Sequence, residues 1–305
     1  MIFVSIFVAQ SFYLIILKMN ATNKVGLVLE GGGLRCLFTS GVIDVLMEHG
    51  IDFPATAGVS GGVLFGCNYK SRQPGRALRY NIRFKDEPRY MSWKSLRQTG
   101  NYVNDEFSYH KLPYELDPMD FKTYRENSME FYVVCTDIEE GKPVYRRIDD
   151  ADGEGLEWFK ASSSMPVFAK PVEIDGHYYL DGGITDSIPL KFLEGRGYGK
   201  NVVVLTQPKD YKKKKAQLYL LLRLWHRKFP KVAQLMRVRH KMYNAQLDYI
   251  AEQERSGKAF IVCPDETLGI GRIEQDETKM RNVYEAGRRK AEEMLPQLLE
   301  FLEGK

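Results

Sequence analysis

The stretch Gly58-Val59-Ser60-Gly61-Gly62 places one serine among small residues. It follows the short run 53–57 and precedes an apolar segment, and this context predicts a strand, a sharp turn and a helix. A residue at the tip of such a turn has strained backbone and needs small neighbours. The turn would lift the hydroxyl of Ser60 over the unpaired N–H groups of the helix start. These residues are typical of a nucleophile for acyl transfer, but an ordinary glycine-rich turn containing a serine would also fit.

A second glycine-rich turn precedes the first. Residues 25–30 predict a buried strand, and Gly31-Gly32-Gly33-Leu34-Arg35 leads from it into an apolar helix. Consecutive glycines let backbone N–H groups approach an anion closely. In acyl transfer that anion is the tetrahedral oxyanion, and each preorganised donor contributes roughly 10²–10³ in rate.

Two nucleotide-binding motifs fit this turn less well. A dinucleotide-binding loop requires glycine at position 36, where the chain has Cys36, and Asp52 is a poor match to the acid that should end its second strand. A P-loop requires a Lys-Ser/Thr ending, which neither glycine-rich turn has.

A nucleophilic serine needs a base within hydrogen-bond reach. None of the five histidines lies in a good triad context: His49, His110, His177, His226 and His240. Asp181-Gly182-Gly183 follows a predicted short strand, and a buried carboxylate of raised proton affinity can act as the base itself. Taken alone, this stretch is more typical of a β-turn.

Together these segments resemble the patatin-like phospholipase family. The matching segments, in chain order, are Gly31-Gly32-Gly33-Leu34-Arg35, Gly58-Val59-Ser60-Gly61-Gly62, Ala161-Ser162-Ser163-Ser164-Met165-Pro166 and Asp181-Gly182-Gly183. Four segments in the right order are far more specific than any one of them. The resemblance implies an α/β fold: a three-layer α/β/α domain with a mostly parallel central sheet and a helical C-terminal extension.

The resemblance also implies roles for individual residues. Ser60 would be the nucleophile, Asp181 the general base, and the amides of Gly31 to Leu34 the oxyanion hole. Supporting positions would be Arg35, Gly58, Gly61, Gly62, Gly182 and Gly183. The chain departs from the family at Cys36, where glycine is usual, so the geometry of the hole is open at that point. Such a Ser-Asp dyad needs neither a metal nor an organic cofactor.

The segments between these motifs predict the rest of the fold. Residues 71–128 favour short helices and loops that could wall the pocket, so Trp93, Tyr102 and Phe107 would either touch substrate or fill a small core. Strands are predicted at 129–136, 144–148, 171–180 (a hairpin), 201–206 (closing the sheet) and 258–263, and helices at 154–162, 231–254 and 276–302.

Composition sets the broad class. A chain of 305 residues, 44% hydrophobic and with net charge +4, can form one large α/β domain. Its four cysteines include no C-x-x-C pair, which favours a reducing, cytoplasmic setting. We expect an apolar lead (1–24), a catalytic core (25–207) and a basic helical region with a final strand and helix (208–305).

Residues 1–17 are almost wholly apolar. They lack the basic start and small-residue cleavage site of a secretory signal, and they are slightly short for a membrane anchor. We favour Met19 as the true start of translation over an anchor that would hold the domain against a bilayer.

Residues 209–241 carry twelve Lys or Arg and one acid. An apolar stripe at helical spacing lies within them: Leu218, Leu221, Leu222, Trp225 and Phe229. This segment fits peripheral contact with an anionic membrane, and equally a core helix with a solvated basic face. No nucleic-acid-binding motif accompanies it.

The sequence as a whole therefore predicts a serine acyl hydrolase acting on lipid esters. The alternatives are an esterase or thioesterase on soluble acyl substrates, a lipid-binding or regulatory module without turnover and, more remotely, a nucleotide-binding protein. The head group, the acyl chain and the oligomeric state are not readable from the residues.

Overall fold

The structure is a computed structural model that describes residues 24–215 and 229–304. Its centre is one eight-stranded sheet, in the order β5-β6-β3-β2-β1-β7-β8, with β4 paired to β3. The strands are β1 (Val25–Leu29), β2 (Ala55–Val59), β3 (Glu130–Asp137), β4 (Lys142–Arg147), β5 (Val172–Ile174), β6 (His177–Asp181), β7 (Lys200–Val204) and β8 (Ala259–Val262).

The central strands β3, β2, β1, β7 and β8 pair in parallel, and the β4, β5 and β6 pairings are antiparallel. The carboxyl ends of β1 and β2 therefore lie side by side, with Leu29 opposite Gly58. Asp181 at the end of β6 pairs with Cys135 of β3. The prediction that residues 201–206 close the sheet is wrong, because β7 lies between β1 and β8.

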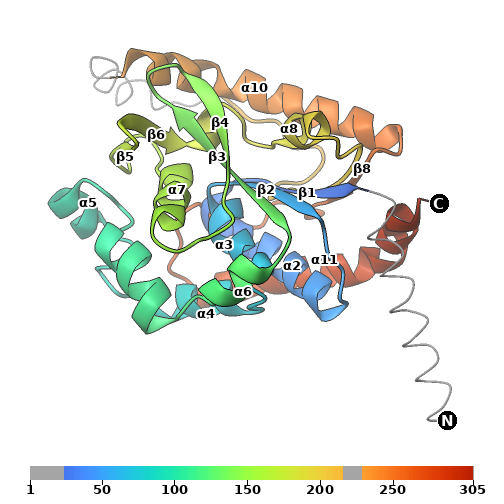
Figure 1. Cartoon of the computed structure of the whole chain (residues 1–305), viewed down its shortest axis with the longest axis horizontal. Helices are drawn as coiled ribbons and strands as arrows, with labels where there is room; N and C mark the ends of the chain where they lie inside the picture. The colour runs from blue at the N-terminus through green and yellow to red at the C-terminus, as the bar shows by residue number, and fades with distance from the viewer. Residues whose placement is uncertain (1–23, 216–228, 305) are drawn as a thin grey trace, which may run out of the picture.

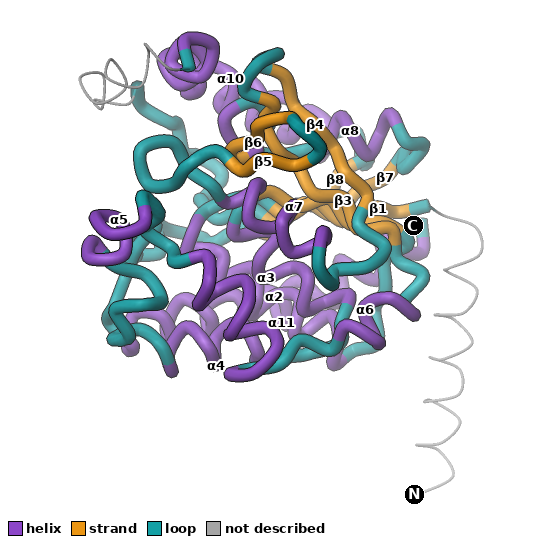
Figure 2. Tube along the Cα trace, turned by 60° about the vertical axis from the view of Figure 1, so that its left-hand side comes forward, coloured by secondary structure: helices purple, strands orange, loops and turns teal. Residues whose placement is uncertain are grey.

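Helices cover both faces of the sheet (Figures 1 and 2). On one face lie α8 (Leu190–Gly195) and α10 (Pro230–Arg255); on the other lie α2 (Leu37–Glu48), α3 (Gly61–Lys70), α7 (Glu154–Ser163) and α11 (Glu277–Glu303). This is the predicted three-layer α/β/α arrangement. The family that the sequence resembles implied it, and periodicity alone located most of the elements.

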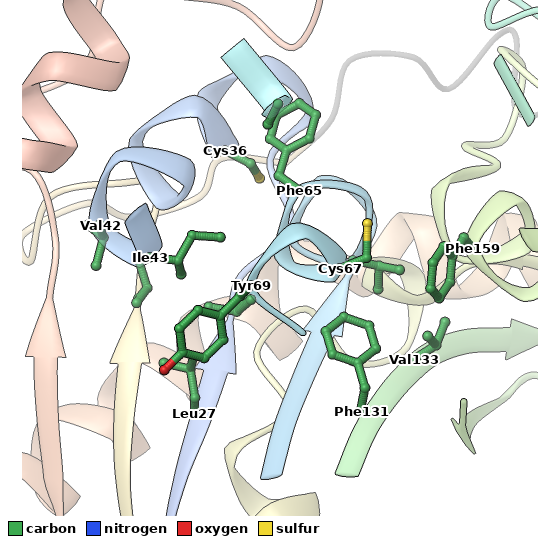
Figure 3. Packing of buried hydrophobic residues seen from close by; sticks show 14 of the residues in the cluster. Leu27, Cys36, Val42, Ile43, Phe65, Cys67, Tyr69, Phe131, Val133 and Phe159 are labelled. Carbon is green, nitrogen blue, oxygen red and sulfur yellow. The ribbon is translucent and has the colours of Figure 1, made fainter. Parts of the chain in front are cut away.

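The strands bury side chains on both faces. Along β1, Leu27 and Leu29 belong to the core under α2, α3 and α11, whereas Val28 belongs to the core under α8 and α10. The same alternation recurs in β7, because successive residues of a strand point to opposite faces. Figure 3 shows the larger core, where Leu27 and Phe131 meet side chains of α2 and α3. Doubly buried strands explain the near-continuous apolar runs in the sequence.

Residues 71–128 form short helices, as expected: α4 (Arg76–Arg83), α5 (Trp93–Thr99), the π-helical segment η2 (Glu106–Leu116) and α6 (Phe121–Glu126). Two short 3-10 segments lie at the motifs, η1 (Gly33–Cys36) and η3 (Gly182–Ile184).

Two of the predictions fall on other parts of the chain. The apolar run 1–17 and four members of the apolar stripe, Leu218, Leu221, Leu222 and Trp225, lie outside the described residues. Among the helices within 24–215 and 229–304, none combines the length and apolar character needed to cross a bilayer.

Candidate active site

Ser60 lies in the turn between β2 and α3, with φ 54° and ψ −123°. A positive φ is uncommon for a residue with a side chain and indicates a strained turn. The neighbouring glycines make this turn possible: a Cβ on Gly58 would lie 3.0 Å from the carbonyl oxygen of Gly62, and one on Gly62 would lie 2.6 Å from that of Leu29. The predicted strand, sharp turn and helix are therefore present, and Ser60 occupies the tip.

The glycine-rich turn after β1 packs directly against this elbow. A Cβ on Gly31 would lie 3.1 Å from Cβ of Ser60, and one on Gly61 would lie 2.8 Å from the carbonyl oxygen of Gly33. Gly33 itself has φ +60°. The absence of side chains thus lets two backbone turns touch beside one hydroxyl.

The N–H groups of this turn differ in their availability. Leu34 donates its N–H to the carbonyl oxygen of Arg272 over 3.1 Å. Gly32 lies against the thiol of Cys36 and hydrogen-bonds to its sulfur. The N–H groups of Gly31, Gly33 and Gly61 have no acceptor within the described residues. The sequence analysis placed the hydroxyl of Ser60 over the unpaired N–H groups of the helix start, and Gly61 is the first residue of that helix.

Cys36, the departure from the family pattern, lies at the far side of this turn. It is fully buried, and its thiol donates to the carbonyl oxygen of Glu30 over 3.4 Å. A Cβ on Gly61 would lie 2.8 Å from its sulfur. Burial raises the pKa of Cys36 well above its ordinary value, so the thiol stays protonated. Cys36 therefore fills space behind the elbow.

Asp181 ends β6 and is 4% exposed. Its carboxylate accepts a 2.7 Å hydrogen bond from the N–H of Gly183. Burial raises the pKa of Asp181, and the positive charge of Arg239 and a hydrogen bond from the side chain of Ser60 oppose that rise. The two motif residues, 121 positions apart in the sequence, thus meet in space, and the carboxyl has the raised proton affinity that a base needs.

Strand β3 holds Asp181 in place. A Cβ on Gly182 would overlap the carbonyl oxygen of Val134, so only glycine fits at position 182 beside β3. Thr136 donates its hydroxyl to the carbonyl oxygen of Asp181 over 2.9 Å. Neither Val134 nor Thr136 had a signal in the sequence beyond lying in a predicted strand.

Ser162 links the elbow to the same strand. Its fully buried hydroxyl accepts the N–H of Ser60 over 3.0 Å and donates to the carbonyl oxygen of Val134 over 2.7 Å. The Ser-Ser-Ser-Met-Pro stretch therefore includes a group that orients the elbow. The sequence pattern predicted a helix end here. Only the resemblance to the family, in which this stretch is one of the matching segments, indicated that it has a role at the site.

A cavity of about 560 Å³ opens from Ser60 between α4, η2 and α7. Its walls are mostly apolar and aromatic, among them Leu64, Phe65, Tyr80, Tyr102, Leu156 and Phe159. Of the three aromatic residues singled out from the sequence, Tyr102 lines the cavity, Phe107 is buried in the core, and Trp93 is 66% exposed.

Of the histidines that the structure describes, none lines this cavity. His49 pairs with Glu292 at 3.2 Å and His177 lies 3.9 Å from Glu139, both at exposed positions. Within the described residues, no cluster of three or more His, Cys, Asp or Glu side chains is arranged to hold a metal ion.

Comparisons with known proteins address the family to which the chain belongs. A family model described as patatin-like phospholipase matches residues 27–193, more than half of the chain, and a model for a domain of unknown function (DUF6363) matches residues 229–303. The chain is 28% identical over 192 residues to the uncharacterized protein YjjU of Escherichia coli, covering 61% of this chain and 53% of that protein.

Fungal relatives extend the comparison. The chain is 28% identical over 185 residues to "Lysophospholipase nte1" of Aspergillus oryzae, covering 57% of this chain and 11% of that protein. It therefore spans about half of the bacterial relative and about a tenth of the fungal one. Among solved structures, VipD from Legionella pneumophila superposes with a TM-score of 0.46 at 13% identity, covering 91% of this chain and 67% of that one.

Proposed function

Because the chain belongs to the patatin-like phospholipase family, we propose that it is a serine hydrolase that cleaves acyl ester bonds of lipids, with Ser60 as nucleophile and Asp181 as base. The observation that carries the proposal is that the side chain of Ser60, which lines a mostly apolar cavity, interacts with the buried carboxyl of Asp181.

The chemistry follows from these positions. The oxygen of Ser60 attacks the ester carbonyl, and its proton passes to the carboxylate of Asp181. The tetrahedral intermediate collapses to an acyl-serine when Asp181 returns that proton to the departing alcohol. A water molecule then attacks the acyl-serine with Asp181 again as base, releasing the carboxylic acid and restoring the hydroxyl of Ser60.

The negative charge of each intermediate needs donors beside Ser60. We assign this oxyanion hole to the backbone N–H groups of the Gly31–Gly33 turn, with Gly61 as an added donor. Gly31, Gly33 and Gly61 carry N–H groups without an acceptor in the described chain, next to the nucleophile. Leu34 can join them only after releasing the carbonyl of Arg272.

The cavity supports a lipid substrate over a small soluble ester. Its volume and its apolar, aromatic walls suit an acyl chain, which gains about 0.8 kcal/mol for each CH₂ removed from water. The fungal relatives bear the name lysophospholipase, which points the same way. We place the enzyme at a membrane surface, held there by the cations of residues 209–241.

A fluorophosphonate probe tests the proposal. The wild type should become covalently labelled and should release fatty acid from a lysophospholipid, and Ser60→Ala should lose both by about 10⁴-fold or more. Ser163→Ala, which changes another cavity serine, is the matched control and should still label. Labelling that persists in Ser60→Ala would remove Ser60 as nucleophile. A wild type that binds lipid vesicles without labelling would favour a lipid-binding module.

A further inference from the structure

Four cationic side chains form a cluster that borders the site: the charges of Arg239 and Arg272 act on Asp181, and Lys213 and Arg35 lie near these two arginines. Arg35 belongs to the glycine-rich turn, Lys213 follows β7, Arg239 lies on α10, and Arg272 lies in the segment before α11. Arg239 and Arg272 fall within the region that matches a domain of unknown function. Three of the four cations therefore come from the part of the chain beyond the family's catalytic segments.

Contacts fix these residues at the site. Arg272 lines the same cavity as Ser60, and its carbonyl oxygen accepts the N–H of Leu34. Arg239 donates from Nε to the carbonyl oxygen of Gly183, and its Nη2 lies 3.4 Å from the hydroxyl of Ser187. These two contacts leave several of the five N–H donors of Arg239 for another partner.

The other two cations are also held by neighbours that carry no charge. The ammonium of Lys213 lies 3.9 Å from the ring centre of Tyr243. Arg35 is half-buried, and its Nε is buried without a hydrogen-bond partner among the residues that the structure describes. A buried donor without an acceptor costs about 1–3 kcal/mol, so such a group usually has a role.

None of these four cations forms a salt bridge with any described residue. By contrast, neighbouring cations do: Lys209 pairs with Glu254, Lys212 with Asp248 and Arg288 with Glu48. Two carboxylates lie near them: Asp181, whose charge interacts with Arg239 and Arg272, and Glu30, which is 1% exposed and accepts hydrogen bonds from Tyr243 and Thr206. Four cations thus share two carboxylates, and this excess of positive charge is unfavourable unless an anion binds among them.

The proton affinities show the same repulsion. Partial burial and then the charges of Arg239 and Arg272 lower the pKa of Lys213 to about 7. Arg272 is exposed as a residue, yet desolvation of its guanidinium and the charge of Arg239 lower its pKa to about 10. A bound anion would oppose both shifts.

We propose that Arg239 and Arg272, with Lys213 and Arg35, bind the phosphate of the lipid head group and select substrates whose head group is anionic. Guanidinium groups bind phosphate oxygens in pairs of hydrogen bonds. The excess positive charge repels the ammonium of a choline or ethanolamine head group. This selection rests on the proposed hydrolysis at Ser60. In that reaction, the C-terminal region would select the substrate by its head group.

The test compares two lysolipids with the same acyl chain, lysophosphatidylglycerol and lysophosphatidylcholine, at equal mole fraction in neutral detergent micelles. The wild type should favour the anionic lipid in kcat/KM by about tenfold or more. Arg239→Gln and Arg272→Gln should each lower kcat/KM for the anionic lipid about tenfold, since one charged hydrogen bond to phosphate contributes 1.5–3 kcal/mol and 1.4 kcal/mol is a factor of ten. They should lower it less for the choline lipid, because the loss of a cation also relieves the repulsion of the ammonium, so the preference falls. Glutamine at 272 keeps the backbone carbonyl that binds Leu34.

Arg237→Gln is the matched control, because Arg237 is exposed on the same helix and its loss changes the net charge equally. It should leave the preference unchanged. Inorganic phosphate should raise KM for the anionic lipid in the wild type and do so less in Arg239→Gln.

Equal kcat/KM for both lipids, unchanged by the arginine variants, would overturn the head-group site and leave hydrolysis at Ser60 intact. Phosphate that raises KM in the wild type and less so in Arg239→Gln, while the wild type hydrolyses both lipids equally, would show a site for free phosphate and overturn selection of lipids. Failure of the proposed role of Ser60 is recognised separately, because the Ser60→Ala variant would then keep full turnover.

Discussion

The two glycine-rich turns and the C-terminal segment 229–304 border the same site but are held there differently. The turns after β1 and β2 touch backbone to backbone, with Gly31 against Ser60 and Gly61 against Gly33. The C-terminal segment reaches the site mainly through long side chains, Arg239 and Arg272, plus one backbone hydrogen bond to Leu34.

This difference separates two tasks. Backbone contacts between glycines leave the reacting atoms little room to move, and acyl transfer depends on such close positioning. Long cationic side chains can adapt to a bulky head group. Substituting them should therefore change the preference between substrates more than the rate of the chemical step. We therefore expect substitutions in the turns and on β6 to lower turnover, and substitutions in the C-terminal segment to change selectivity.

The largest effect should come from the base. Asp181→Asn should slow labelling by a fluorophosphonate about 10²–10⁴-fold, because the amide cannot accept the proton of Ser60. The amide can still accept the hydrogen bond from Gly183, so the circular dichroism spectrum should match that of the wild type. Labelling at the wild-type rate would assign the base to another group.

The pH profile sharpens the same point. Burial raises the pKa of Asp181, so kcat/KM should fall with decreasing pH at an apparent pKa above the ordinary value of about 3.9. The folded chain then holds this proton more tightly than the unfolded chain, so the contribution of Asp181 to stability should decrease as pH rises through that interval. An acid limb at or below pH 3.9 would contradict a buried base.

Gly61→Ala, which adds a methyl group between the two glycine-rich turns, should have the next largest effect on turnover. The Cβ of Gly61→Ala would lie 2.8 Å from both the sulfur of Cys36 and the carbonyl oxygen of Gly33, so the turns must separate. We expect kcat to fall about 10–10²-fold and the free energy of unfolding to fall by about 1–3 kcal/mol. Gly195→Ala, at a position in α8 with nothing near the new Cβ, should change neither.

The smallest effect on turnover should come from Ser162→Ala. The change removes the acceptor of the Ser60 N–H and the donor to Val134, at a cost of about 1–3 kcal/mol in the free energy of unfolding. We expect kcat to fall several-fold, because the elbow keeps its glycine contacts. Denaturant titration measures the loss, and the exposed Ser256→Ala should stay within about 0.5 kcal/mol of wild type. An unchanged unfolding curve would show that Ser162 does not anchor the elbow.

Much of the fold was predictable from local pattern. Apolar runs located β1, β3, β7 and β8, and helical spacing located α10 and α11, because periodicity follows directly from which faces are buried. The sheet order was less accessible. The prediction that β7 closes the sheet failed because neighbouring strands in space, such as β7 and β8, are separated by more than fifty residues.

The sequence by itself determined where the tight turns of the site occur, since Gly31–Gly33, Ser60 and Asp181-Gly182-Gly183 each follow a strand and include the small residues that such turns need. Only the tertiary structure decided which groups meet. Ser162 hydrogen-bonds to Ser60 across 102 positions of the sequence, and the carbonyl of Arg272 accepts the N–H of Leu34 across 238. Arg239 reaches Gly183, next to Asp181, from more than 50 positions away. Contacts between distant residues depend on how the helices pack over the sheet, which local periodicity does not encode.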